Sequence, residues 1–412
     1  MKPILETCAG MDVHRDHITV CVCYGSLAKA EENFIVREFS TMTEGIRLCA
    51  LWLKEFGVKA VGMESTGIFW KPIFNILEYD FEIILANAAR VKNVPGLKTD
   101  KKDARWLAKL LRYGLVPASF IPPRNIRELR DLTRTRRKLV EEMTRQKNRV
   151  QKTLQDANVK LSSVVSNVFG VTGESMIKAL LEKDEFTQEE IESMAKGKLK
   201  KKTDLLMKAM DGRITEHHRF LLKRHLEHID FLAEQVSEFD GMIYSKLEPF
   251  QKEFENVQTE PGMNKVNAAS VIAEIGTNMS RFASEKHISS WAAICPGNNE
   301  SAGKRKSGKT RRGNNYLKAT LTEAAWAASR TKDTLLSEKY NNIARRRGKK
   351  RAVIAVAHQI LKDVYHILDN GEPYRERDVE AIKLQKQDQK EQSMIRELEK
   401  MGYTIQKMDA TT

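Results

Sequence analysis

The sequence predicts an α/β domain at the N-terminus, followed by a longer region that is mainly helical. Over about the first 115 residues, short runs rich in β-branched and aromatic residues alternate with helical patterns. Residues 124–255 contain few helix-breaking residues and carry apolar side chains at heptad-like spacing. These patterns divide the 412 residues into four parts, at 1–118, 119–256, 257–372 and 373–412.

The N-terminal part contains five strand patterns, with helical patterns interleaved after the third. The strands are expected at residues 6–13, 17–24, 33–39, 59–65 and 81–87. The helices are expected at about residues 43–56, 69–78 and 100–113. Three strands followed by helix, strand, helix, strand and helix is the element order of an RNase H-like fold. A doubly wound sheet of another kind is the alternative, because element order alone does not fix strand pairing.

The second part is predicted to form long helices. Residues 124–152 carry eleven Lys or Arg against four acids. Further on, apolar residues recur every seven positions, at Leu222, Ile229, Val236 and Ile243. This spacing is typical of a coiled-coil seam, formed either by an antiparallel hairpin within one chain or by helices of two chains. The stretch between the two helices, about 163–212, includes the lysine-rich segment 196–202 and is predicted to be an insert at the hairpin tip.

The third part begins at a turn, at residues 260–262, and is predicted to be mainly helical. A helix is expected over 268–275, then a loop-rich basic stretch at 295–318, then helices at about 316–329 and 350–368. The highly charged tail that follows is expected to be a solvated helix or disordered.

The charge balance indicates a polyanionic partner. Seventy Lys and Arg against 55 Asp and Glu give a formal net charge of +15, which favours binding to nucleic-acid phosphates. A ribosome-associated or merely basic protein is the alternative on charge alone. No window approaches the roughly 18 uncharged apolar residues of a membrane span. Five cysteines without paired metal spacing favour buried thiols and a reducing, cytoplasmic setting.

Four acidic residues are the candidate catalytic and metal-binding groups. They lie at the ends of the first and fourth strands and at the start of the last helix of the domain: Asp12, Glu64, Asp100 and Asp103. In an RNase H-like sheet these positions converge, and clustered carboxylates are the ligands that Mg²⁺ or Mn²⁺ prefers. Each residue also has a structural interpretation, such as helix capping by Asp100. The glycines beside them leave open a phosphate-binding kinase of the same superfold.

A basic block between Lys304 and Lys318 is the second chemical signal. It holds seven Lys or Arg and no acid, with glycines spaced by five residues. Contacts to nucleic-acid phosphates are expected from Lys304, Arg305, Lys306, Lys309, Arg311, Arg312 and Asn314. The basic helix at 124–152 is expected to offer a second such surface, through Arg134, Arg137, Arg145 and Arg149. Ser301 lies at the mouth of the block, where its hydroxyl is a candidate phosphoryl acceptor.

Five motifs occur together and in a characteristic order: GMDVHRD, MESTG, TDKKDA, EPGMNKVNAASVIAEIG and CPGNNESAGKRKSGKTRRGN. In this combination the chain resembles the DEDD transposases of bacterial insertion sequences. The family is insertion-sequence family one-ten, also described as bridge-RNA-guided recombinases. The resemblance covers about residues 5–370, and no single motif would be specific alone.

The resemblance implies a transposase or site-specific DNA recombinase. Its N-terminal domain would be RuvC-like, with Asp12, Glu64, Asp100 and Asp103 as the tetrad that binds magnesium or manganese. The catalytic serine of its C-terminal transposase domain would be Ser301, with Ser307 a less favoured neighbour. In such enzymes the serine attacks DNA and forms a phosphoserine link.

The resemblance also implies partners. Donor and target double-stranded DNA would pair with a structured bridge RNA, and the protein would form a homodimer or homotetramer through its coiled-coil region. The active site would be composite, with acids and serine from different subunits. The protein would be cytoplasmic and associated with the bacterial nucleoid when active.

Some features depart from the family or leave alternatives. The insert at about 163–212 has no counterpart in the compact members, and we expect it to contact RNA or DNA. His14 and His17 lie close to Asp12, where packing or backbone binding is favoured over direct chemistry. A RuvC-like structure-specific endonuclease that uses water is the main rival. A basic scaffold with a decayed nuclease fold and a sugar-kinase-like ATPase are weaker alternatives.

Overall fold

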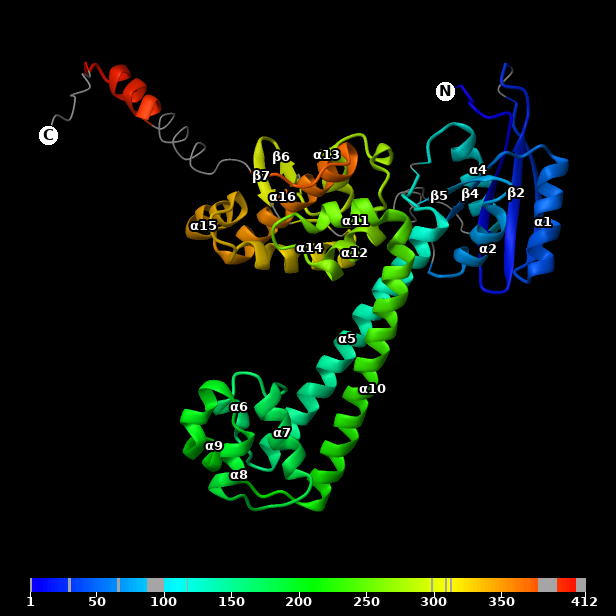
Figure 1. Cartoon of the computed structure of the whole chain (residues 1–412). Helices are drawn as coiled ribbons and strands as arrows, with labels where there is room; N and C mark the ends of the chain where they lie inside the picture. Colours follow the sequence, from blue (N-terminus) through cyan, green and yellow to red (C-terminus); the bar gives the residue numbers. More distant parts are fainter. Residues whose placement is uncertain are drawn as a thin grey trace. The chain divides into compact units, whose positions relative to one another are not determined.

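The computed structural model shows an N-terminal α/β unit and a mainly helical remainder (Figure 1). The described residues are 2–28, 31–64, 67–86, 100–116, 118–297, 299–307, 310–311, 313–376 and 391–404. The chain divides into two compact units, Met1–Ile121 and Pro122–Thr412.

The N-terminal unit is built on a five-stranded mixed sheet. The strands are β1 (Thr7–Val13), β2 (His17–Tyr24), β3 (Asn33–Ser40), β4 (Ala60–Glu64) and β5 (Glu82–Ala86). Their spatial order is β3-β2-β1-β4-β5. The first three strands pair antiparallel, whereas β4 runs parallel to both β1 and β5. The predicted α/β class is therefore confirmed, and this arrangement is consistent with an RNase H-like domain.

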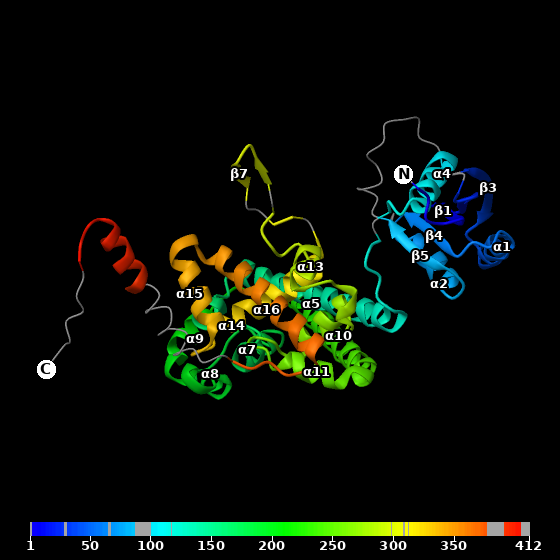
Figure 2. The same ribbon diagram turned by 90° about the horizontal axis from the view of Figure 1, so that it is seen from above.

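Helices cover both faces of this sheet (Figure 2). They are α1 (Thr43–Glu55), α2 (Trp70–Leu77) and α4 (Asp100–Arg112). On one face the strands pack with α1 and α2 around Ile18, Leu53 and Leu77. On the other face α4 packs through small residues such as Ala104 and Ala108 against the thiols of β1 and β2. The thiols of Cys8, Cys21, Cys23 and Cys49 are free and buried, as the sequence predicts, whereas Cys295 is only partly buried.

Two long helices of the second unit, α5 (Arg124–Asp156) and α10 (Glu216–Leu247), lie side by side within one chain (Figures 1 and 2). The heptad residues Leu222, Ile229 and Ile243 are buried in this hairpin, and Val236 is partly buried. An ion pair between Arg136 and Asp240 crosses it. In this chain the predicted seam therefore packs as an intramolecular hairpin.

The insert at the tip of the hairpin is a folded helical subdomain. Its elements are α6 (Leu161–Val164), α7 (Val171–Leu180), α8 (Gln188–Met194), the 3₁₀ helix η1 (Gly197–Lys202) and α9 (Thr203–Met210). Apolar side chains such as Met176, Ile191 and Leu206 form a core that continues into α5 and α10 through Val150 and Leu222. The tip thus shares one apolar core with the ends of the two long helices, and the lysines at 196–202 are exposed.

The C-terminal part is a helical layer with one small hairpin. Its elements are η2 (Glu248–Phe250), α11 (Gln251–Gln258), α12 (Lys265–Ile275), η3 (Met279–Arg281), α13 (Glu285–Trp291), β6 (Asn299–Ser301), β7 (Lys304–Ser307), α14 (Asn315–Ala328), α15 (Leu335–Arg347) and α16 (Lys349–Asn370). The long helix α16 is central and packs against α11, α13, α14 and α15. In the part of the chain that the structure describes, no helix combines the length and apolarity needed to cross a membrane.

Candidate active site

The register of the sheet brings Asp12 and Glu64 to the same level. Strands β1 and β4 are parallel and pair Met11 with Met63, so Asp12 and Glu64 are the next residues on neighbouring strands. Alternation along a strand puts them on the same face as Gly10 and Gly62. That face is covered by α4, because a Cβ built on Gly10 would lie 2.3 Å from the carbonyl oxygen of Ala104. The first and fourth strands therefore present both carboxylates toward α4.

The start of α4 brings two further carboxylates to this place. Asp100 and Asp103 lie in its first turn. Ala104 and Ala108, which lie over Gly10 of β1, follow in the next two turns. Burial is the main cause that raises the pKa of Asp12, and the negative charges of Asp100 and Asp103 raise it further, against the opposing effect of His14. Charges affect one another's pKa only at short range, so Asp12, Asp100 and Asp103 lie close together. The pairing of β1 with β4 adds Glu64, the fourth predicted acid.

Two histidines complete this cluster. The Nε2 atom of His14 lies 3.2 Å from Oδ2 of Asp12 and 3.3 Å from Oδ2 of Asp100. The Nε2 atom of His17 lies 3.4 Å from the same Asp100 oxygen, and the two rings are stacked with centroids 4.7 Å apart. The sequence favours packing or backbone binding for these histidines, and their rings do pack against each other, but their contacts with Asp12 and Asp100 were not predicted. The signal was their spacing, since two residues three positions apart across a tight turn become cross-strand neighbours.

Ser301 is the last residue of β6, in a hairpin of the second unit. Strands β6 and β7 are antiparallel, and Ser301 pairs with Lys304. The two residues between them, Ala302 and Gly303, have φ of 51° and 73°, which is the conformation of a type I′ turn. The loop-rich prediction for this stretch was therefore wrong in part. The hairpin was missed because its two strands are short and carry no β-branched side chains.

The residues of the basic block that are predicted to contact nucleic acid differ in their structural surroundings. Lys304, Arg305 and Lys306 make up most of β7. Arg311 is exposed and donates to the Oγ of Ser290. Lys309 and Arg312 lie outside the described residues.

Asn314 and Arg134 meet at a buried carboxylate. The side chain of Asn314 caps α14 through Oδ1 and donates from Nδ2 to Oε2 of Glu274 at 2.6 Å. Arg134 donates two hydrogen bonds to the same carboxylate, at 2.7 and 2.8 Å. Glu274 is 2% exposed. No local motif predicts this network, which joins α5, α12 and the start of α14 and engages two predicted nucleic-acid-binding side chains, both partly buried, with a carboxylate of the protein.

Of the other three predicted arginines of α5, Arg145 and Arg149 are exposed and Arg137 is partly buried. Arg137 pairs with Glu323 at 2.6 Å, Arg145 pairs with Glu142, and Arg149 lies 3.9 Å from Glu142. Exposed pairs of this kind contribute little to stability, so their guanidinium groups are available to exchange partners.

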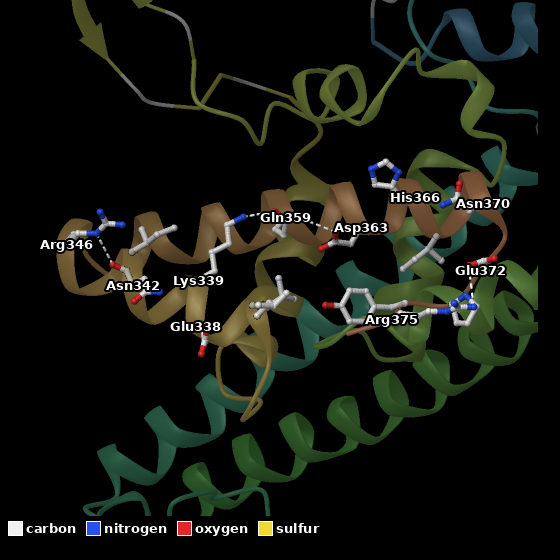
Figure 3. A pocket seen from close by; sticks show the side chains of 16 residues that line it. Glu338, Lys339, Asn342, Arg346, Gln359, Asp363, His366, Asn370, Glu372 and Arg375 are labelled. Carbon is white, nitrogen blue, oxygen red and sulfur yellow. Dashed lines mark hydrogen bonds and ion pairs between the residues drawn. The ribbon is translucent and has the colours of Figure 1, made fainter. Parts of the chain in front are cut away.

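A cavity of about 830 Å³ lies between α15, α16 and the segment that follows α16 (Figure 3). Charged and polar side chains from both helices face it, and Lys339, Gln359 and Asp363 form a hydrogen-bonded chain along one wall. Nearby, Glu260 is 1% exposed, and within the described residues neither of its carboxyl oxygens has a hydrogen-bond partner. Residues more than 100 positions apart build this region, so no local motif predicts it.

Comparison with protein families gives two matches. Residues 9–159 match a family described as Transposase, of the DEDD IS110 type. Residues 254–341 match the Transposase IS116/IS110/IS902 family. The first match contains the four acids and both histidines, and the second contains the Ser301 hairpin and Glu274. No curated protein matches the chain.

Proposed function

The chain belongs to the IS110 family of DEDD transposases, and from this premise we propose that it cuts and rejoins donor and target DNA, with Ser301 as nucleophile and the four acids as a metal-binding site. The observation that carries the proposal is the convergence of Asp12, Asp100 and Asp103 where α4 begins. Like charges held close together repel one another without a counter-charge, so the presence of this partly exposed group favours a catalytic over a structural role.

The residues of this cluster fit a divalent cation. Asp12, Glu64, Asp100 and Asp103 supply the oxygen donors that magnesium or manganese takes. The buried hydroxyl of Thr19, directly opposite Asp12 in the β1–β2 register, has no hydrogen-bond partner among the described residues. When bound, the ion would neutralise phosphate charge and lower the pKa of an attacking hydroxyl. The protein's part is to hold four carboxylates in place with a glycine-lined contact between β1 and α4.

Ser301 supplies the group that distinguishes strand transfer from hydrolysis. Its Oγ would form a bond to phosphorus while one ester bond of the DNA backbone breaks and the serine proton passes to a base. The phosphoserine link would keep an activated phosphate for rejoining to a second DNA end. The tight turn after Ser301 supports this role because it fixes the backbone at the serine on a short, defined hairpin.

Sequence choice is proposed to come from a structured bridge RNA, with the protein holding nucleic-acid backbones. The basic sequence of β7, the exposed Arg145 and Arg149 of α5 and the exposed lysines of η1 support this. Contacts to phosphates position nucleic acid without reading its sequence, which suits a partner whose specificity lies in base pairing.

Assembly into dimers or tetramers is proposed to involve the outer face of α10. Three large apolar side chains are spaced by eleven residues and are more than half exposed: Phe220, Phe231 and Met242. Eleven residues are about three helical turns, so the three side chains lie along one stripe. Such a stripe supports the packing of a second copy of the chain.

Covalent trapping tests the proposal. The full chain, RNA from the flanking element, labelled donor and target DNA and magnesium are incubated, denatured and separated on a gel. We expect a protein–DNA adduct that disappears with Ser301→Ala and persists with Ser307→Ala, its matched control on the same hairpin. Cleavage that continues in Ser301→Ala without any adduct would mean that water is the nucleophile, and the RuvC-like endonuclease function would replace the recombinase.

A further inference from the structure

We propose that His14, His17 and Asp100 form a mixed nitrogen–oxygen site that binds a transition-metal dication such as Mn²⁺ in preference to Mg²⁺. The inference rests on the proposed function, because Asp100 belongs to the acidic site. It goes beyond that function by adding two imidazole ligands and by naming the class of ion that they select.

The donor atoms already have the separations that one ion requires. Ligand atoms about 2.1 Å from a common ion lie about 3.0 Å apart at right angles and about 3.4 Å apart in a tetrahedron. The Nε2 atoms of His14 and His17 lie 3.3 and 3.4 Å from Oδ2 of Asp100. Asp12 lies outside this group of three and contacts Nε2 of His14 at 3.2 Å. One donor from each of His14, His17 and Asp100 falls within 4.8 Å of the others.

The backbone holds the two imidazoles in this arrangement. His14 donates its backbone N–H to the carbonyl of His17 at 3.0 Å, which closes the β1–β2 turn and places the residues opposite one another. Their rings are stacked at an interplanar angle of 20°, so each ring restricts the rotation of the other. A site preorganised in this way pays less conformational entropy when it binds an ion.

The chemistry of the donor set decides the preferred ion. Magnesium takes oxygen ligands in near-ideal octahedral geometry and has little affinity for imidazole. Imidazole nitrogen suits manganese, cobalt and zinc, whose affinities for such sites follow the Irving–Williams order.

Manganese binding to the full, chelator-treated chain tests the inference without reference to catalysis. Bound Mn²⁺ is quantified by the loss of the free-ion EPR signal, and pulsed EPR detects ¹⁴N nuclei of coordinated imidazole. We expect nitrogen coupling in the wild type and Mn²⁺ binding at least about tenfold tighter than Mg²⁺. In His14→Gln/His17→Gln we expect the nitrogen coupling to vanish and the Mn²⁺ affinity to fall about tenfold, with a much smaller change for Mg²⁺.

Two controls keep the result interpretable. His17→Phe retains a stacked ring while it removes one donor, so it should lower the number of coupled nitrogens without loss of the fold. His217→Gln changes an exposed histidine on α10 and should leave the spectrum unchanged. Bound Mn²⁺ without nitrogen coupling, or unchanged Mn²⁺ affinity in the double variant, would overturn the inference.

The same preparations separate this inference from the proposed function. A Ser301-dependent DNA adduct together with a nitrogen-free manganese site would leave the recombinase standing and remove the histidine ligands. Nitrogen coupling in a chain that forms no adduct would establish the mixed site and remove the recombinase.

Discussion

Gly10 of β1 lies directly beneath Ala104 of α4, so close that a Cβ on Gly10 would lie 2.3 Å from the Ala104 carbonyl oxygen and 2.4 Å from the Ala108 nitrogen. Both obstructing atoms belong to the helix backbone, which cannot rotate away as a side chain can. The distance between α4 and the sheet, and with it the position of Asp100 and Asp103 relative to Asp12, depends on this glycine.

Gly10→Ala should therefore impair the acidic site more than it impairs folding. To reach an ordinary contact distance α4 must move by about 1 Å, and overpacking of this kind costs about 1–3 kcal/mol. A misplacement of about 1 Å can reduce the rate of catalysis about 100-fold. DNA cleavage rates and thermal unfolding of the variant measure both effects.

The control for this change is Gly241→Ala. Gly241 lies in α10 with no atom within 4 Å of the added Cβ, so alanine should stabilise the helix by about 0.5–1 kcal/mol and leave cleavage unchanged. Full cleavage by Gly10→Ala would show that the site tolerates displacement of α4.

Asp12→Asn should abolish strand cleavage while nucleic-acid binding stays largely intact. The change removes the charge of a carboxylate whose side chain is 15% exposed but keeps its shape, and binding depends on basic surfaces elsewhere. Cleavage assays and filter binding with the same DNA separate the two activities. Asp16→Asn is the matched control, because the side chain of Asp16 is 85% exposed on the same hairpin. A cleavage rate equal to wild type in Asp12→Asn would remove the metal-site assignment.

Much of the fold could be predicted because local periodicity decides it. The run of β-forming residues at 17–24 gives β2 with the predicted bounds, and the predicted helix at 100–113 is α4 to within one residue. The acids could be found because their positions at element ends are visible in the sequence.

The rest depends on pairings over long sequence separations. Arg134 and Glu274 are 140 residues apart, and nothing near Arg134 indicates that its guanidinium is taken up by a buried carboxylate. The histidine contacts with Asp100 likewise depend on where α4 docks. Side-chain type identified the basic residues, but only packing decides which of them face solvent.

Replacement of the exposed apolar stripe on α10 should reduce the oligomeric state. Phe220, Phe231 and Met242 are 62, 56 and 53% exposed, so the triple serine variant should change the stability of the chain by less than about 1 kcal/mol. Sedimentation velocity should show a shift toward smaller species with the fold retained. A control of similar chemistry is Val171→Ser with Leu205→Ser, two exposed apolar residues of the tip. An unchanged sedimentation profile of the triple variant would place the assembly surface elsewhere.

Removal of the lysines of η1 should weaken nucleic-acid binding and reduce its salt dependence. Lys198, Lys200, Lys201 and Lys202 are exposed and form no ion pair within the described part of the chain. If all four contact phosphates of a duplex, their replacement by serine should reduce the slope of log affinity against log salt by about 3 to 4. Titrations with duplex DNA and with the structured RNA show which partner loses affinity.

Replacement of the same four lysines by arginine is the control, because it preserves charge and should preserve the salt slope. Equal slopes for the serine variant and the wild type on both nucleic acids would mean that the tip does not contact phosphates.

The buried carboxyl group of Glu260 should make the second unit less stable as pH rises. Burial is the main cause, and the charges of Asp363 and Glu376 add to it, so that the pKa of Glu260 is raised to about 10. Between its ordinary pKa of 4.5 and about 10, the folded chain keeps a proton that the unfolded chain releases. Stability is therefore greatest below the ordinary pKa and falls with rising pH, by at most about 1.4 kcal/mol per pH unit.

Glu260→Gln carries no charge in either state, so its free energy of unfolding should depend less on pH and should exceed that of the wild type at pH 8. Urea unfolding at pH 5 and pH 8 measures the difference, with Glu255→Gln, an exposed change on α11, as the control. If the wild type and Glu260→Gln lost stability equally between these two pH values, Glu260 would have to be ionised in the folded chain, and a counter-charge would have to reach it.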